Sequence, residues 1–137
     1  MKKIYIAYKF KEKDKKELKT KLEELSKIVE DSLRCKTFIF FRDAQNWGEK
    51  KMDIKEVVDK AMMHLKECDA ILVEASEKAN GIYFEVGYAK ALGKKVIIIH
   101  KKGTEASFLE SAGDISIEYE DFKDLREKLE GIELPKT

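Results

Sequence analysis

Residues 74 to 95, EASEKANGIYFEVGYAKALGKK, hold a carboxylate in a setting that composition does not explain. After Gly81 the apolar residues recur at helical spacing, and Glu85 stands beside that stripe, one turn into the predicted helix, between Phe84 and Val86. Burial raises the pKa of a carboxylic acid, whereas a helix N-terminus favours its anion. Glu85 is therefore either a solvent-facing residue that compensates the helix dipole or a reactive group at a ligand crevice.

The elements that must position this carboxylate alternate along the chain. Short apolar runs predict strands at residues 3–8, 37–41, 70–74, 95–100 and 115–119. Helical periods cover residues 18–29, 54–68, 81–92, 104–111 and 122–129, and Gly93 is expected to end the third of these helices. The unbroken runs TFIFF, AILV and VIII are typical of strands buried on both faces. Residues 1–137 are thus expected to form one α/β domain, a flavodoxin-like three-layer sandwich with a five-stranded parallel sheet in the order 2-1-3-4-5.

Ligands of such sheets bind beyond the carboxyl ends of the strands. This rule selects three segments, which are residues 8–13, 74–85 and 101–107. Glu85 belongs to the second, which favours the ligand-crevice interpretation.

Composition excludes several classes of protein. The chain has 28 Lys and Arg against 27 Asp and Glu, a net charge of +1, which argues against binding of a nucleic acid polymer. No apolar run approaches the roughly 20 residues of a membrane-spanning helix, so no membrane contact is expected. The N-terminus enters a strand pattern at once and shows no signal-peptide core, which predicts a cytoplasmic protein. Two cysteines and two histidines are scattered at Cys35, Cys68, His64 and His100, so neither a disulfide framework nor a metal site is expected. No cofactor is expected either.

A family resemblance rests on the segment that contains Glu85. The segment begins with a hydrophobic strand, and after it come Glu74-Ala75-Ser76, a short loop, Gly81, Glu85-Val86-Gly87-Tyr88-Ala89 and Gly93-Lys94-Lys95-Val96. This pattern resembles the core motif of the nucleoside 2-deoxyribosyltransferase superfamily. It is especially similar to the 2'-deoxynucleoside 5'-phosphate N-hydrolase branch. The resemblance is clearest over residues 68–112.

The resemblance implies cleavage of the N-glycosidic bond of a small-molecule nucleoside or nucleotide. Glu85 would be the nucleophile on the anomeric carbon, and water or a second base would resolve the glycosyl-enzyme ester, as in retaining glycosidases. Tyr5 matches a tyrosine whose hydroxyl approaches the nucleophile, although Tyr8, nearer the strand end, fits equally well. Both Tyr5 and Glu85 are thus candidate catalytic residues.

The same resemblance implies the substrate-binding residues. Asn80 and Gly81 would shape the loop under the sugar, and the bare backbone of Gly81 would permit a tight turn and close ligand approach. Ser107 matches a serine that reaches the 5'-phosphate across a dimer interface, which predicts a homodimer.

In the loop after the first strand, Tyr8, Lys9 and Phe10 replace the small residues of the family, so that a lysine–phosphate contact would substitute for a backbone cradle. The chain also carries Ala61 and Ala79 at positions where the family has an aspartate and a serine.

Two alternatives stay open. The N-terminal stretch IYIAYKFKEKDKKELKTKLEEL is similar to the start of Toll/interleukin-1 receptor (TIR) domains, whose enzymatic members use a glutamate to release nicotinamide from NAD. Trp47 and Arg42 could contact a nucleotide under either resemblance, or Trp47 could be a hydrophobic plug. The third class is a non-catalytic TIR-like interaction module.

Overall fold

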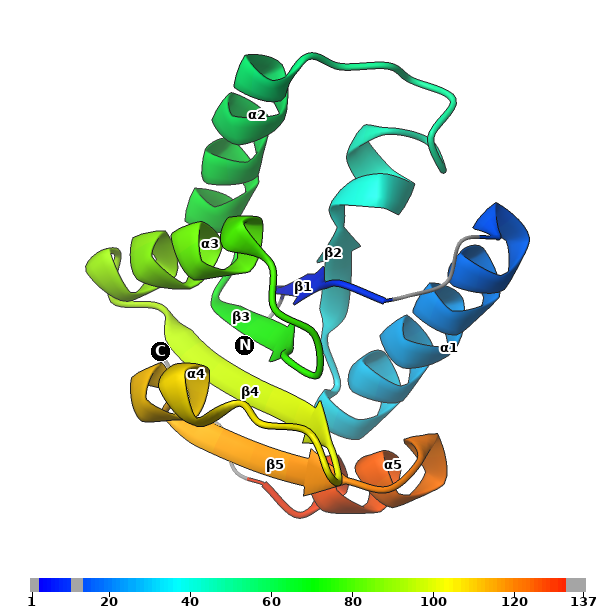
Figure 1. The fold of residues 1–137 in the computed structure, drawn as a ribbon, viewed down its shortest axis with the longest axis vertical. Helices are drawn as coiled ribbons and strands as arrows, with labels where there is room; N and C mark the ends of the chain where they lie inside the picture. Colours follow the sequence, from blue (N-terminus) through cyan, green and yellow to red (C-terminus); the bar gives the residue numbers. More distant parts are fainter. Residues whose placement is uncertain (1–2, 11–13, 133–137) are drawn as a thin grey trace.

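The computed structural model describes residues 3–10 and 14–132. Their strands form one sheet in the order β2-β1-β3-β4-β5, and every neighbouring pair is parallel (Figure 1). Both the α/β flavodoxin-like fold and the predicted strand order are confirmed. The strands are β1 (Lys3–Tyr8), β2 (Lys36–Ile39), β3 (Ala70–Glu74), β4 (Lys95–Lys101) and β5 (Ile115–Tyr119).

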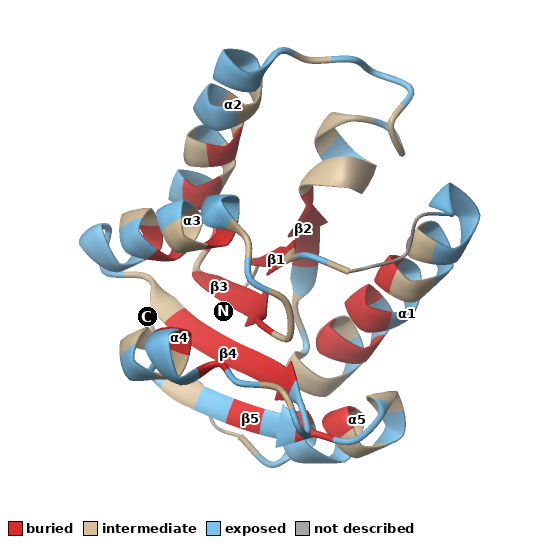
Figure 2. Cartoon of the chain, viewed as in Figure 1, coloured by how far each residue is buried: buried red, intermediate tan, exposed pale blue. Residues whose placement is uncertain are grey.

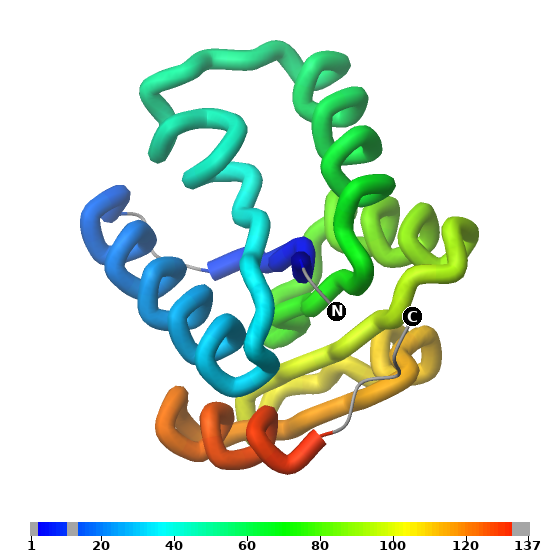
Figure 3. Tube along the Cα trace, turned by 180° about the vertical axis from the view of Figure 1, so that it is seen from behind, coloured from blue at the N-terminus to red at the C-terminus, as the bar shows by residue number. Residues whose placement is uncertain are grey.

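Helices cover both faces of the sheet. One face carries α2 (Ile54–Glu67), α3 (Asn80–Ala91) and α4 (Ser107–Ala112), and the other carries α1 (Lys15–Leu33) and α5 (Phe122–Glu130). The view from behind shows α1 and α5 side by side (Figure 3). Each helical layer closes over its own cluster of buried side chains, so the sheet is the common wall of two cores.

Strand alternation decides which core each side chain enters. In β1, Ile6 faces α1 and α5, whereas Tyr5 faces α2 and α3. In β3, Val73 joins Tyr5, whereas Glu74 points to the same side as Ile6. The central strands are buried along most of their length (Figure 2). A polar residue near a strand end therefore faces one helical layer or the other, depending on whether its position along the strand is odd or even.

The second strand is shorter than the sequence predicts. It ends at Ile39, and Phe40–Ala44 forms a single π-helical turn, η1. The cause is local: the Ile39 amide donates to the Asp43 carboxylate at 2.9 Å, and Arg42 donates to a backbone carbonyl of β2 at 2.8 Å. These contacts draw the chain out of the sheet before the aromatic run is complete.

The predicted apolar stripe of α2 is correct only in its second half. Ala61 and Leu65 are buried, but Ile54 is 83% exposed and Val58 is also exposed. The first turns of α2 extend past the edge of the sheet, so no strand lies under them (Figure 1). At the next helix, the predicted stop is confirmed, because Gly93 has φ +76°, a conformation that favours glycine.

Candidate active site

A hydrogen bond between β1 and α3 forms the centre of the candidate site. The Tyr5 hydroxyl donates to Oε2 of Glu85. The Tyr5 ring is fully buried and packs against Phe38, with 5.2 Å between ring centroids. Glu85 is half-buried at the face of α3 next to the sheet. The hydroxyl thus reaches the carboxylate from a rigid strand and not from a loop.

Burial raises the pKa of Glu85 to about 7, and the hydrogen bond from Tyr5 opposes this rise. The helix dipole acts most strongly in the first turn of a helix. Glu85 is the sixth residue of α3 and lies beyond that turn. Desolvation therefore outweighs the dipole. Burial and the negative charge of Glu85 hold the pKa of Tyr5 far above its ordinary value, so this hydroxyl keeps its proton and remains a donor.

The orientation of Glu85 follows from the packing of α3. Ile82, Val86 and Ala89 form the expected buried stripe of this helix. The loop before it is joined to the sheet by the Ala75 amide, which donates to the carbonyl of Ile99 at 2.8 Å. Because the stripe holds α3 against the sheet, the side chain one residue before Val86 meets Tyr5 of β1.

The sequence fits either Tyr5 or Tyr8 as the tyrosine beside Glu85, and the structure shows that the two have different contacts. Tyr5 contacts Glu85 directly, whereas Tyr8 stacks on Phe10 with 5.5 Å between ring centroids. Burial and the charge of Glu85 raise the pKa of Tyr8 to about 12, so Tyr8 also stays protonated near the site. Lys9 is exposed, and residues 11–13 of the selected segment lie outside the described residues.

Asn80 and Gly81 belong to the same helix as Glu85, and no side-chain hydrogen bond from either to Glu85 is formed among the described residues. Asn80 and Gly81 are exposed at the start of α3. The expected tight turn at Gly81 is wrong, because Gly81 is helical, lacks a positive φ, and a Cβ there would meet no atom within 4 Å. Close approach of a ligand to Gly81 stays a prediction.

Ser107 is the exposed first residue of α4, and its hydroxyl donates to Oε1 of Glu105 at 3.0 Å. It lines a cavity of about 380 Å³ together with Tyr83 and Phe108, whose rings meet edge to face. Phe108 is 75% exposed. This cavity lies on the same face of the sheet as Glu85, but Glu85 does not line it.

Alanines occupy the two positions that differ from the resembled family. Ala61 is buried, and Asp59 is exposed and pairs with Lys55 at 3.0 Å, so Asp59 does not replace an aspartate at position 61. Ala79 precedes α3 and supplies no side-chain cap. Among residues 3–10 and 14–132, no group of three or more His, Cys, Asp and Glu side chains is arranged to hold a metal ion.

Two residues of the 40–50 loop that could contact a nucleotide are engaged within the protein. The Arg42 guanidinium binds the Asp43 carboxylate at 2.9 Å and the hydroxyl of Ser26 at 2.9 Å. The Trp47 ring packs on Phe41 at the border of the core, which supports its role as a hydrophobic plug.

Sequence reasoning missed a buried carboxylate network on the other face of the sheet. Glu74 is fully buried at the end of β3 and accepts hydrogen bonds from the Ser76 amide at 2.8 Å, from the Ser76 hydroxyl at 3.0 Å and from the hydroxyl of Tyr119 in β5. The Lys101 amide in β4 donates to the Ser76 hydroxyl at 2.8 Å. The available signal was a glutamate directly continuing an otherwise apolar central strand.

The chain thus combines a flavodoxin-like α/β fold with a half-buried carboxylate that a tyrosine hydroxyl binds beside a parallel sheet. The model of the nucleoside 2-deoxyribosyltransferase family matches residues 4–127, and the chain belongs to this family of nucleoside-processing enzymes.

Solved structures agree with the fold. A CMP N-glycosidase, BcmB, from Clostridium botulinum is 20% identical, with a TM-score of 0.66 over 93% of this chain and 98% of that one. A 2-deoxyribosyltransferase from Bacillus psychrosaccharolyticus is 20% identical, with a TM-score of 0.63 over 96% and 92% of the two chains. BlsM is 12% identical, with a TM-score of 0.68 over 94% and 87%. None of the curated proteins matches this chain in sequence. Within the described residues no helix is long and apolar enough to cross a bilayer.

Proposed function

We propose that this protein is an N-glycosidase that cleaves the bond between base and sugar in a nucleoside or nucleoside 5'-monophosphate, with Glu85 as the nucleophile. The observation that carries the proposal is the half-buried Glu85 carboxylate held by the Tyr5 hydroxyl. Membership of the nucleoside 2-deoxyribosyltransferase family and the fold shared with a CMP N-glycosidase support it.

In the first step, Oε1 of Glu85, the oxygen that Tyr5 does not bind, attacks C1' of the sugar. A C1'–O bond forms as the C1'–N bond breaks, and the electron pair of the broken bond stays on the base, which takes up a proton from water. The transition state resembles an oxocarbenium ion, so the adjacent carboxylate stabilises its positive charge before bonding.

In the second step, a water oxygen attacks C1', and the ester bond to Glu85 breaks. The electron pair returns to Glu85, and water releases the proton that balances the one taken up by the base. The Tyr5 hydroxyl donates to the carboxylate as it leaves, which makes Glu85 a better leaving group. A transferase would use a nitrogen of a second base in place of water.

A homodimer is part of the proposal. Ser107 and the largely exposed Phe108 lie together at the start of α4, where a partner could both cover the ring and receive the serine hydroxyl at its 5'-phosphate. Sedimentation at micromolar concentration tests this, and a monomer would contradict the shared site. In a dimer, Ser107→Ala is expected to raise KM for a nucleoside monophosphate but not for the matching nucleoside.

The deciding experiment measures released base by chromatography after incubation with deoxynucleosides, deoxynucleoside monophosphates, ribonucleoside monophosphates and NAD. Base release is expected with a nucleoside or nucleotide, and Glu85→Gln is expected to lower its rate by about 10³-fold or more. Glu127→Gln, an exposed glutamate on α5, is the matched control and is expected to keep full activity.

Each other outcome overturns part of the proposal. Base release that persists in Glu85→Gln would remove Glu85 as the nucleophile. Nicotinamide release alone would replace the proposal by the TIR-like NAD glycohydrolase alternative, and no release from any substrate would replace it by a non-catalytic module. Mass spectrometry of quenched enzyme would detect the sugar ester on Glu85, and an acceptor base added in excess would distinguish transfer from hydrolysis.

A further inference from the structure

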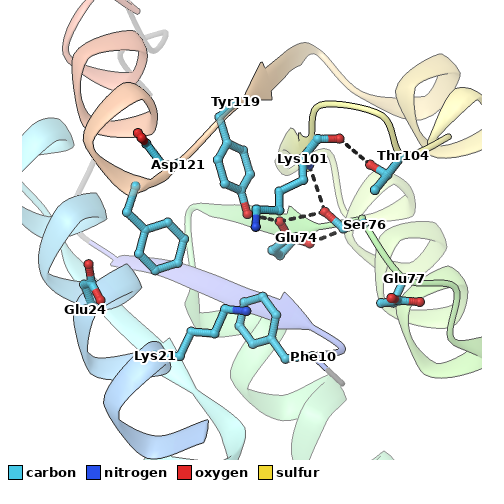
Figure 4. A pocket seen from close by; sticks show the side chains of 11 residues that line it. Phe10, Lys21, Glu24, Glu74, Ser76, Glu77, Lys101, Thr104, Tyr119 and Asp121 are labelled. Carbon is cyan, nitrogen blue, oxygen red and sulfur yellow. Dashed lines mark hydrogen bonds between the residues drawn. The ribbon is translucent and has the colours of Figure 1, made fainter. Parts of the chain in front are cut away.

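The two helical layers differ in how well they cover their large apolar side chains. On the face that carries α1 and α5, a cavity of about 530 Å³ opens between these two helices (Figure 4). Its aromatic lining residues Phe10, Tyr119 and Phe122 are buried or half-buried. Among the described residues, the exposed large apolar side chains all lie on α2, α3 and α4 or directly after them: Ile54, Val58, Met63, Phe84, Leu92 and Phe108. The layer that contains Glu85 is therefore the incompletely covered one.

Side chains of α2 and α3 form one apolar patch on this layer. Met62 and Met63 of α2 and Tyr88 of α3 line a groove of about 280 Å³. The Tyr88 ring stacks on the ring of Phe84, with 6.4 Å between centroids and 3° between the ring planes. Met63 is 46% exposed and Phe84 is 45% exposed. These four residues are called the α2–α3 patch below, and adjoining exposed apolar side chains of this kind are typical of a surface that another protein covers.

A charged residue lies on each side of the methionine pair. Asp59 and Lys66 line the same groove as Met62 and Met63, because residues spaced i, i+3, i+4 and i+7 share one face of a helix. Lys55 binds Oδ2 of Asp59 at 3.0 Å in an exposed pair, and Oδ1 is left for a second cation. Within the described residues the Lys66 ammonium has no hydrogen-bond or ion-pair partner. The groove thus has a negative end and a positive end.

This order of charges is complementary to itself. The midpoint between Asp59 and Lys66 falls between Met62 and Met63. A second α2 that runs antiparallel across a two-fold axis at this midpoint places Asp59 opposite Lys66 of the partner subunit, and the same pair forms again on the other side of the axis. The methionines of both copies then meet at the centre, where their flexible side chains can fill the groove. A second copy of the chain therefore matches both the apolar and the charged parts of the surface.

We propose that the α2–α3 patch is a two-fold interface between two copies of this chain. Met62 and Met63 lie at its centre, and Asp59 pairs with Lys66 of the partner subunit at each edge. This interface is distinct from the contact proposed at α4, since Ser107 and Phe108 line a different cavity. It goes beyond the glycosidase reaction and does not depend on it. A chain that uses both contacts assembles beyond a dimer.

Sedimentation equilibrium of the Phe108→Ser protein tests this interface by itself, because the change removes the exposed ring from the α4 contact. A monomer–dimer equilibrium at micromolar concentration is expected. Adding Met63→Lys places a charge at the two-fold axis and is expected to weaken dimerisation about tenfold or more. A Phe108→Ser protein that is monomeric at roughly 100 μM would overturn the proposal, as would unchanged dimerisation after Met63→Lys.

The order of the charges allows a sharper test by mixing two variants. Asp59→Lys and Lys66→Glu, each made in the Phe108→Ser protein, are each expected to weaken self-association about tenfold or more, because like charges then meet at both edges. Their equimolar mixture is expected to form a heterodimer as tight as the parent dimer, since one copy is then positive at both edges and the other is negative. Restored dimerisation also shows that both variants are folded. The matched controls are Glu127→Lys and Lys123→Glu, which make the same charge changes on exposed positions of α5 and should have no effect.

Two outcomes of the mixing test would contradict the proposed interface. A mixture that stays monomeric would rule out the antiparallel pairing of α2. Equal association of the two α5 variants on mixing would show that net charge, and not this surface, drives dimerisation. Glu85→Gln is expected to keep the wild-type assembly even though it loses base release, so that the interface and the glycosidase reaction fail separately.

Discussion

The hydroxyl of Tyr5, in the first strand, donates to the carboxylate of Glu85, in the third helix, and this bond spans 80 positions of sequence. The bond has two physical effects. It stabilises the Glu85 anion and so limits the rise in its pKa that burial causes. It also fixes one carboxylate oxygen and leaves the other for chemistry.

Tyr5→Phe should therefore alter the pH dependence of catalysis and not only its rate. The ring and its packing on Phe38 remain, but Glu85 loses the donor that lowers its pKa. We expect kcat to fall roughly 10- to 100-fold and the acidic limb of the pH profile to move to higher pH. Steady-state kinetics from pH 5 to 9 measure both. A limb that stays in place or moves to lower pH would contradict the role of Tyr5.

The wild-type enzyme should lose activity in acid. A nucleophilic carboxylate must be ionised, and the pKa of Glu85 is about 7. We expect kcat/KM to rise about tenfold per pH unit below 7 and to level off above it, since this parameter reports ionisation in the free enzyme. A profile that is flat from pH 5 to 8 would show that Glu85 ionises near 4.5, its ordinary value, and would contradict the effect of burial.

Glu85 should also make the folded protein less stable as pH rises. The unfolded chain releases the Glu85 proton near pH 4.5, whereas the folded protein releases it near pH 7. Between these values the folded state binds more protons, so raising the pH favours unfolding by an amount on the order of 3 kcal/mol. Glu85→Gln lacks this effect. Urea unfolding at pH 4.5 and pH 8 should show the variant gaining stability relative to wild type at the higher pH, and a constant difference would contradict the linkage.

The hydroxyl of Tyr119 should be important for stability. Burial and the charge of Glu74 hold the pKa of Tyr119 far above its ordinary value, so it remains a donor. Tyr119→Phe leaves the buried Glu74 short of one hydrogen bond, and we expect a loss of about 1–3 kcal/mol in the free energy of unfolding. Tyr88→Phe, at a half-buried tyrosine on α3, is the control and should cost less. Equal losses would mean that the Glu74 contact contributes nothing.

Local patterns predicted much of this molecule. The apolar runs and the helical period located the five strands and the long helices of the described residues, and they placed Glu85 beside the stripe Ile82, Val86 and Ala89. Where the local pattern failed, long-range geometry was the cause. Ile54 fits the helical period of α2 but is exposed, because the sheet ends before that turn.

The sequence by itself determined the fold class, the strand order and the family motif around Glu85, because hydrophobic periodicity and chain connectivity limit a parallel sheet to few arrangements. Tertiary structure alone showed that Tyr5, and not Tyr8, donates a hydrogen bond to Glu85. The two are three positions apart in one strand and point to opposite faces, and only one face carries α3. The bond between Glu74 and Tyr119 also depends on tertiary structure, since β4 separates β3 from β5 in the sheet and both residues line the cavity between α1 and α5.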